Sequence, residues 1–101
     1  EEVCIRPKGV KKSARNKFYK NGRLEWLVEV FYAEDYDGHP KETKEASPRW
    51  FPIGKIPYSR MWPDDRFWMP LMLEGKRFTA EFYYKDNWEN LAGHKITTIH
   101  R

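Results

Sequence analysis

The sequence has very little cysteine and no long apolar run. Cys4 is the one cysteine among 101 residues, so no disulfide can form within the chain, and disulfide-rich secreted scaffolds are excluded. No stretch approaches the roughly 20 consecutive apolar residues that a membrane-spanning helix needs. No charged-then-apolar leader follows Glu1. These absences predict a soluble protein of the cytoplasm with no membrane partner.

Aromatic residues, in contrast, are abundant. Five Trp, six Tyr and six Phe make up 17% of the chain, which is enough to build one core largely from rings. A length of 101 residues fits one domain and leaves no room for a second substantial one. We therefore expect a single folded domain over residues 1–101.

Acidic residues are missing from one part of the chain. Between Arg6 and Arg23 there are eight basic residues and no acid, although the whole chain carries a net charge of only +4. One interpretation is an arm that faces phosphates through Lys11, Lys12 and Arg23, because clustered cations stabilise a polyanion. The alternative is an edge strand whose lysines discourage pairing with another sheet.

Turn-forming residues divide the first half of the chain. Asn21-Gly22 supplies the two positive-φ positions of a type I′ turn between two segments rich in aromatic and β-branched residues. This pattern predicts a basic β-hairpin over residues 6–32. The polar residues 33–47 are expected to form a loop, and residues 49–53, bounded by prolines, a short strand.

The second half predicts one helix and two strands. Pro63, two following aspartates and a later Gly75 favour a helix over residues 63–74. Residues 77–84 and 95–99 are typical of strands, with a turn between them at 85–87. The fold class is thus α+β, with a mixed sheet of about five strands and one helix. Little remains to cover the second face of that sheet.

Two adjacent carboxylates, Asp64 and Asp65, lie between the indoles of Trp62 and Trp68. Burial beside aromatic rings and mutual repulsion would raise the pKa of one of the two acids, so that it could donate a hydrogen bond to the edge of a stacked purine. In the alternative interpretation the two acids only cap the helix and the indoles fill the core.

The segment over residues 50–78 carries a resemblance to a known family. Trp50-Phe51, Ile56-Pro57 and the run Met61-Trp62-Pro63-Asp64-Asp65 are followed at fixed spacing by Trp68 and then by Pro70-Leu71. This pattern resembles the C-terminal part of Nudix (MutT-like) hydrolases of the 8-oxo-dGTP diphosphatase branch. The resemblance implies part of a Nudix-like mixed sheet and descent from a magnesium-dependent purine nucleoside triphosphate pyrophosphohydrolase.

The resemblance also implies a nucleobase site. Asp64 and Asp65 match the acids that bind the purine edge, and two tryptophans match the walls beside the base. Glu45 matches an acid that reaches the metal or the attacking water, although locally it is equally a solvated loop residue. The six implied nucleobase-binding residues are Phe18, Trp26, Trp62, Asp64, Asp65 and Trp68.

Most of the Nudix box is missing from the sequence. Residues 1–5 fit only its last five positions, with Cys4 where the family has glycine. The resemblance implies that Glu1, Glu2 and Glu45 belong to the Mg²⁺-binding set, which is incomplete without the catalytic helix. We therefore expect a truncated Nudix-like domain that binds a purine nucleotide but is catalytically inactive on its own.

Two other functions stay open. A truncated descendant could act as a nucleotide-binding or self-assembling module, because an uncovered aromatic sheet face favours a homodimer. Alternatively, the basic residues between Arg6 and Arg23 could bind nucleic acid. His39, His94 and His100 lack the spacing of a metal site.

Overall fold

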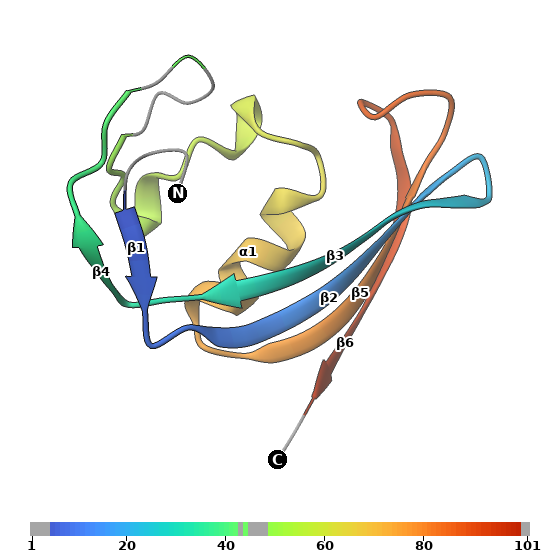
Figure 1. Cartoon of the computed structure of the whole chain (residues 1–101). Coiled ribbons are helices and arrows are strands. Elements are labelled where there is room, and N and C mark those ends of the chain that lie inside the picture. Colours follow the sequence, from blue (N-terminus) through green and yellow to red (C-terminus); the bar gives the residue numbers. More distant parts are fainter. Residues whose placement is uncertain (1–4, 43, 45–48, 100–101) are drawn as a thin grey trace. The chain divides into compact units, whose positions relative to one another are not determined.

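A computed structural model describes residues 5–42, 44 and 49–99 (Figure 1). Contacts divide the chain, for which the sequence predicts one domain, into two compact units. The smaller unit comprises Glu1–Lys11 and Tyr32–Ile56, and the larger unit comprises Lys12–Phe31 and Pro57–Arg101. In the described part of the chain, no helix is long and apolar enough to cross a membrane.

The larger unit is built on a four-stranded mixed sheet with the strand order β3-β2-β5-β6. The central strands β2 and β5 pair in parallel, with Ala14 opposite Phe78 and Lys20 opposite Tyr84, whereas β5 and β6 are antiparallel. This sheet and one α-helix confirm the predicted α+β class. The strands are β2 (Lys11–Lys20), β3 (Arg23–Tyr32), β5 (Arg77–Tyr84) and β6 (Leu91–Ile99).

Asn21 and Gly22 connect β2 to β3, and both have positive φ, 52° and 79°. These are the dihedral signs that a two-residue type I′ turn requires. Asn21 also fixes this turn against the β5–β6 connection. Its backbone N–H donates to the Tyr84 carbonyl at 2.9 Å, and its side-chain oxygen accepts from the Asp86 N–H at 3.0 Å.

The helix α1 runs from Asp65 to Leu73, within the segment 63–74 where the sequence predicts a helix, and includes Pro70. Two backbone hydrogen bonds cap the C-terminus of α1. The Gly75 N–H donates to the Met72 carbonyl, and the Lys76 N–H donates to the Leu71 carbonyl. With Gly75 at φ 79°, this is the Schellman arrangement. Figure 1 shows α1 lying against one face of the sheet.

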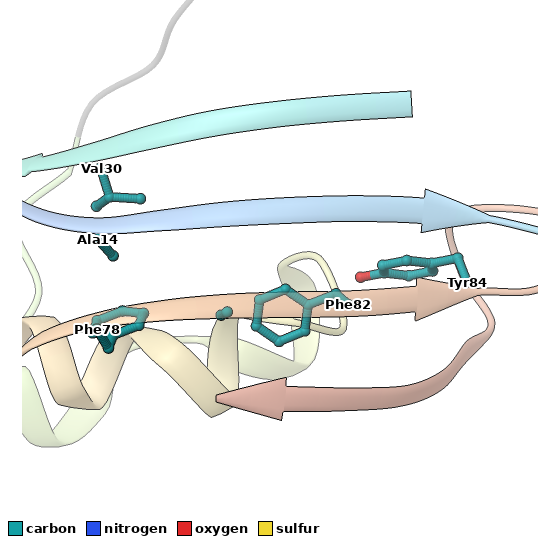
Figure 2. Close-up of a cluster of buried hydrophobic side chains, with 6 residues drawn as sticks. Ala14, Val30, Phe78, Phe82 and Tyr84 are labelled. Atoms are coloured by element: carbon teal, nitrogen blue, oxygen red, sulfur yellow. The ribbon is translucent and has the colours of Figure 1, made fainter. Parts of the chain in front are cut away.

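The core lies between α1 and the sheet. Alternate residues of β5 are buried, as expected for a strand with one covered face. Figure 2 shows three of them beside one residue each from β2 and β3. From α1, Trp68, Leu71 and Met72 pack against this cluster. Its six buried members are Ala14, Val30, Phe78, Ala80, Phe82 and Tyr84.

The edge strand β3 is exposed along most of its length. Only Val30 among its ten residues is buried, while Leu24, Trp26 and Leu27 are each about half exposed or more. Side chains on adjacent positions of a strand point to opposite faces, so the apolar groups of Trp26 and Leu27 lie on both faces of this edge. Among the residues that the structure describes, β3 pairs with β2 alone, so its other edge leaves backbone groups without a strand partner beside exposed apolar side chains.

The smaller unit contains the antiparallel strands β1 (Ile5–Lys8) and β4 (Asp35–Gly38). The expectation of a loop throughout residues 33–47 was therefore wrong. A polar strand gives no apolar alternation in the sequence, but here the Lys8 Nζ lies 4.0 and 3.5 Å from carboxylates of Asp35 and Asp37. These cross-strand charges and the backbone ladder hold β4 in place.

The prediction of a strand over residues 49–53 was also wrong. Residues 49–52 have no regular structure, and a 3-10 turn, η1 (Ile53–Lys55), follows Pro52. Pro52 has no backbone N–H to donate to a sheet, which explains why an aromatic sequence does not become a strand here. A second 3-10 turn, η2 (Tyr58–Arg60), precedes the α1 segment in the larger unit.

Candidate functional site

The larger unit contains an aromatic cavity of about 500 Å³. This volume lies within the usual range for small-molecule sites, roughly 300–1,000 Å³. Its lining comes from β2, β3, the start of α1 and the β5–β6 connection. It includes all six residues for which the resemblance implies nucleobase contacts. The lining residues are Asn16, Phe18, Trp26, Val28, Val30, Trp62, Asp64, Asp65, Trp68 and Trp88.

Asp64 is almost completely buried, and both of its carboxylate oxygens are engaged. The Tyr84 hydroxyl donates to Oδ1 at 2.5 Å, and the Trp68 indole N–H donates to Oδ2 at 2.8 Å. Burial and the bond to Asp64 raise the pKa of Tyr84 well above its usual range. Asp64 therefore fixes the position of Trp68, one helical turn away, and of the Tyr84 phenol.

The alternative in which the two acids only cap the helix was wrong for the side chain of Asp64. Asp64 stands at the N-cap position of α1, but its side chain makes no capping hydrogen bond. Both oxygens are already taken by partners from α1 and β5, which compete with the backbone N–H groups of the first turn. The carboxylate thus connects the helix to the sheet.

Asp65 differs from its neighbour because it is only partly buried. Burial first, and then the nearby Asp64 carboxylate, raise the pKa of Asp65 to about 6. This acid can therefore exchange a proton close to physiological pH. Below that pKa the carboxylic acid carries an O–H that can donate a hydrogen bond, and above it the carboxylate only accepts.

Flat side chains form the walls of the aromatic cavity. Trp26 from β3 is 61% exposed and Trp62 is 54% exposed, so both indoles retain free faces. The Trp62 and Trp88 rings lie 6.0 Å apart, and the Lys20 Nζ lies 5.1 Å from the Trp88 ring. Phe18 stacks on the buried Phe82 at 5.6 Å. Exposed indole faces beside an acid suit a flat heteroaromatic ligand with polar edges.

Asn16 is a lining residue that our sequence interpretation missed. Its side chain is fully buried, and neither amide atom has a hydrogen-bond partner among the residues that the structure describes. The signal was present in the sequence. Asn16 lies on the same face of a predicted strand as Ala14 and Phe18, where the alternation calls for an apolar residue.

The predicted phosphate-facing residues do not line the aromatic cavity. Lys11, Lys12 and Arg23, all within the described ranges, are exposed. Lys12 pairs with Glu29 at 3.0 Å, and the Arg15 guanidinium bonds the same carboxylate at 2.9 Å. These two hydrogen bonds lower the pKa of Glu29. Part of the basic segment is thus neutralised by β3.

The implied metal ligands Glu1, Glu2 and Glu45 lie outside the described residues, as do Cys4 and His100. Within residues 5–42, 44 and 49–99, no three or more His, Cys, Asp or Glu side chains gather in a way that could hold a metal ion. The Mg²⁺ set therefore stays a prediction from the resemblance.

Two curated proteins are similar in sequence to this chain. No protein-family profile matches the chain. It is 42% identical over 84 residues to an oxidized purine nucleoside triphosphate hydrolase of Danio rerio. The aligned segment makes up 82% of this chain and 53% of that protein. The hydrolase of the same name from Mus musculus is 41% identical over 59 residues, covering 58% of this chain and 38% of that protein.

The chain thus spans about half the length of the first of these curated relatives and less of the second. Both identities exceed 40%. The chain also has the aspartate pair and the flanking tryptophans that carry the resemblance, together with the α+β arrangement described above. The resemblance of this chain to part of a Nudix hydrolase of the oxidized purine nucleoside triphosphate branch is therefore confirmed.

Proposed function

We propose that the larger unit binds the base of a purine nucleotide in the aromatic cavity, with oxidised purines as the preferred class. The observation that carries this proposal is the juxtaposition of exposed indoles with a half-buried acid of raised pKa. The names of the two relatives support the choice of an oxidised purine.

Stacking and hydrogen bonding would both contribute to recognition of the base. Stacking of a base on an aromatic side chain contributes about 1–3 kcal/mol and accepts any flat ring. Trp26 and Trp62, with their free faces, are the residues for that contact. Asp65 supplies selectivity, because its proton can be donated to a carbonyl or imine edge, while Asp64 has no free oxygen and holds the wall in place.

For the whole protein we propose hydrolysis of the nucleoside triphosphate to the monophosphate and pyrophosphate. The resemblance implies metal ions, which would supply Lewis-acid chemistry for the attack of water on the triphosphate. Within this sequence, Glu1, Glu2 and Glu45 would hold them. Because only the last five positions of the Nudix box are present, we expect the 101-residue chain to bind nucleotide without turnover.

The test is a titration of the purified chain with 8-oxo-dGMP, followed by tryptophan fluorescence and by calorimetry. dCMP is the ligand control. We expect saturable quenching by the oxidised purine and much weaker binding of the pyrimidine. Equal affinity for both nucleotides, or no saturation, would overturn the base-binding proposal. Separately, robust pyrophosphate release from 8-oxo-dGTP in the presence of Mg²⁺ would overturn the expected inactivity.

A second candidate function, self-association into a homodimer, rests on β3. In the described part of the chain this edge strand pairs with β2 alone, and it exposes Leu24, Leu27 and Phe31 at 49%, 54% and 55%. Such an edge can pair with a second copy. Light scattering at low micromolar concentration tests this function, because a stable monomeric mass would contradict it.

A further inference from the structure

Asn16 is a buried polar group that the protein itself leaves unpaired. It has no solvent exposure, and both Nδ2 and Oδ1 lack partners among the residues that the structure describes. More than nine in ten buried polar groups in folded proteins have a hydrogen-bond partner. An exception at a residue that lines a cavity therefore calls for an explanation.

The surroundings of Asn16 provide no internal partner. In the parallel pairing of β2 with β5 it lies opposite Ala80, whose methyl group offers neither donor nor acceptor. Val28 and Val30 from β3 line the same cavity with hydrocarbon. Of the two carboxylates in the lining, that of Asp64 already accepts from Trp68 and Tyr84, and neither Asp64 nor Asp65 is hydrogen-bonded to the Asn16 amide.

An unpaired buried amide also lowers the stability of the folded state. Leaving a buried donor and acceptor unsatisfied destabilises the folded state, and a leucine at this position would avoid that loss. This loss of stability is offset only when another molecule supplies an acceptor and a donor to the amide. Amide side chains do this when they bind a base edge with two parallel hydrogen bonds.

We propose that Asn16 is a specificity-determining residue that binds the edge of the purine in the aromatic cavity. Its Nδ2–H donates to a carbonyl oxygen of the base, and its Oδ1 accepts from the adjacent ring N–H. A lactam edge of this kind occurs in guanine and is added on the imidazole side when a purine gains an 8-oxo group. This inference rests on the proposed base-binding function and adds a second hydrogen-bonding group to Asp65.

The test compares wild-type protein with Asn16→Leu, which keeps the size of the side chain and removes both hydrogen bonds. Asn90→Leu, at an exposed position outside the cavity, is the matched control. We expect the affinity for 8-oxo-dGMP to fall by about tenfold or more in Asn16→Leu and to stay unchanged in Asn90→Leu. The melting temperature of ligand-free Asn16→Leu should equal or exceed that of the wild type.

The outcomes separate the two proposals. If the wild type binds no purine nucleotide, base binding itself fails and the role of Asn16 fails with it. If the wild type binds and Asn16→Leu binds equally well, only the role of Asn16 is overturned. A lower melting temperature with unchanged affinity would likewise overturn it, because Asn16 would then be a structural residue bonded through buried water.

A measurement on the wild type covers the case in which Asn16→Leu does not fold. The side-chain amide resonances of Asn16, assigned by triple-resonance NMR, should shift during titration with 8-oxo-dGMP, together with the indole N–H resonances of the tryptophans. Movement of the indole resonances with no change at the Asn16 amide would overturn the proposal.

Discussion

The hydroxyl of Tyr84 donates a 2.5 Å hydrogen bond to the buried carboxylate of Asp64. Through this bond the end of a central strand holds the start of α1. The same carboxylate receives the Trp68 indole N–H at 2.8 Å. One acidic side chain therefore sets the position of a wall of the aromatic cavity, and the effect of breaking the bond can be measured.

Replacing Tyr84 with phenylalanine removes the donor and leaves a buried carboxylate oxygen unpaired. A lost hydrogen bond to a charged group that leaves a buried acceptor typically costs about 1–3 kcal/mol. We expect Tyr84→Phe to lower the free energy of unfolding in urea by this amount. Tyr83→Phe, on the exposed face of the same strand, is the control and should change it by less than about 0.5 kcal/mol. Equal effects of the two variants would contradict the structural role of this bond.

The raised pKa of Asp65 gives a pH dependence of stability. In the unfolded chain an aspartate titrates near a pKa of about 3.9, whereas in the folded state that of Asp65 is about 6. The folded state thus binds the proton more tightly. This contribution is fully present below about pH 4 and is lost as the pH rises through about 6.

Asp65→Asn removes this titration. We expect the variant and the wild type to have similar unfolding free energies at pH 4, and the variant to be more stable at pH 7.5. The difference should be on the order of 1 kcal/mol once solvent screening is allowed for. Glu89→Gln, at an exposed position, controls for the loss of one charge. A difference between Asp65→Asn and wild type that does not grow with pH would contradict the raised pKa.

The sequence predicted the elements whose signals are local. The Asn21-Gly22 turn, the strand over residues 77–84 and the turn at Asp86 all depend on conformational preferences of a few neighbouring residues, and each is present. β6 starts at Leu91, earlier than the predicted residue 95. Ala92 and Gly93 have low strand preference, so this part of the strand depends on its pairing with β5 and not on a local signal.

The errors arose where distant partners decide the conformation. β4 depends on its pairing with β1 and on Lys8, which no local pattern of residues 33–47 reveals. In the candidate site, the aspartates and tryptophans were found from their spacing and resemblance. That Asp64 bonds Tyr84, 20 residues away, and that Asn16 lacks any partner among the described residues follow only from packing in three dimensions.

The C-terminal end of α1 provides a stability test that does not involve the cavity. Gly75 has φ 79°, and a β-carbon there would meet nothing within 4 Å, so backbone conformation alone opposes a side chain. We expect Gly75→Ala to lower the unfolding free energy by about 1 kcal/mol. Gly54→Ala, also in open space but without a positive φ, should have a smaller effect. Equal losses would argue against the left-handed conformation at Gly75.

Neighbouring residues of β3 separate ligand contact from general surface hydrophobicity. Trp26 lines the aromatic cavity, whereas Leu27 does not, and both are more than half exposed. Adjacent residues of a strand point to opposite faces, so Leu27→Ala is a control of similar exposure for Trp26→Ala.

We expect Trp26→Ala to weaken binding of 8-oxo-dGMP by about tenfold, because stacking of one base contributes about 1–3 kcal/mol. Leu27→Ala should leave the affinity unchanged, and calorimetric titration of both variants gives the comparison. The unfolding free energy should fall only slightly in either variant, since side chains that are already exposed lose little buried area on truncation. If both variants lose affinity equally, the base does not stack on Trp26, and general hydrophobicity of the β3 edge is the source of binding.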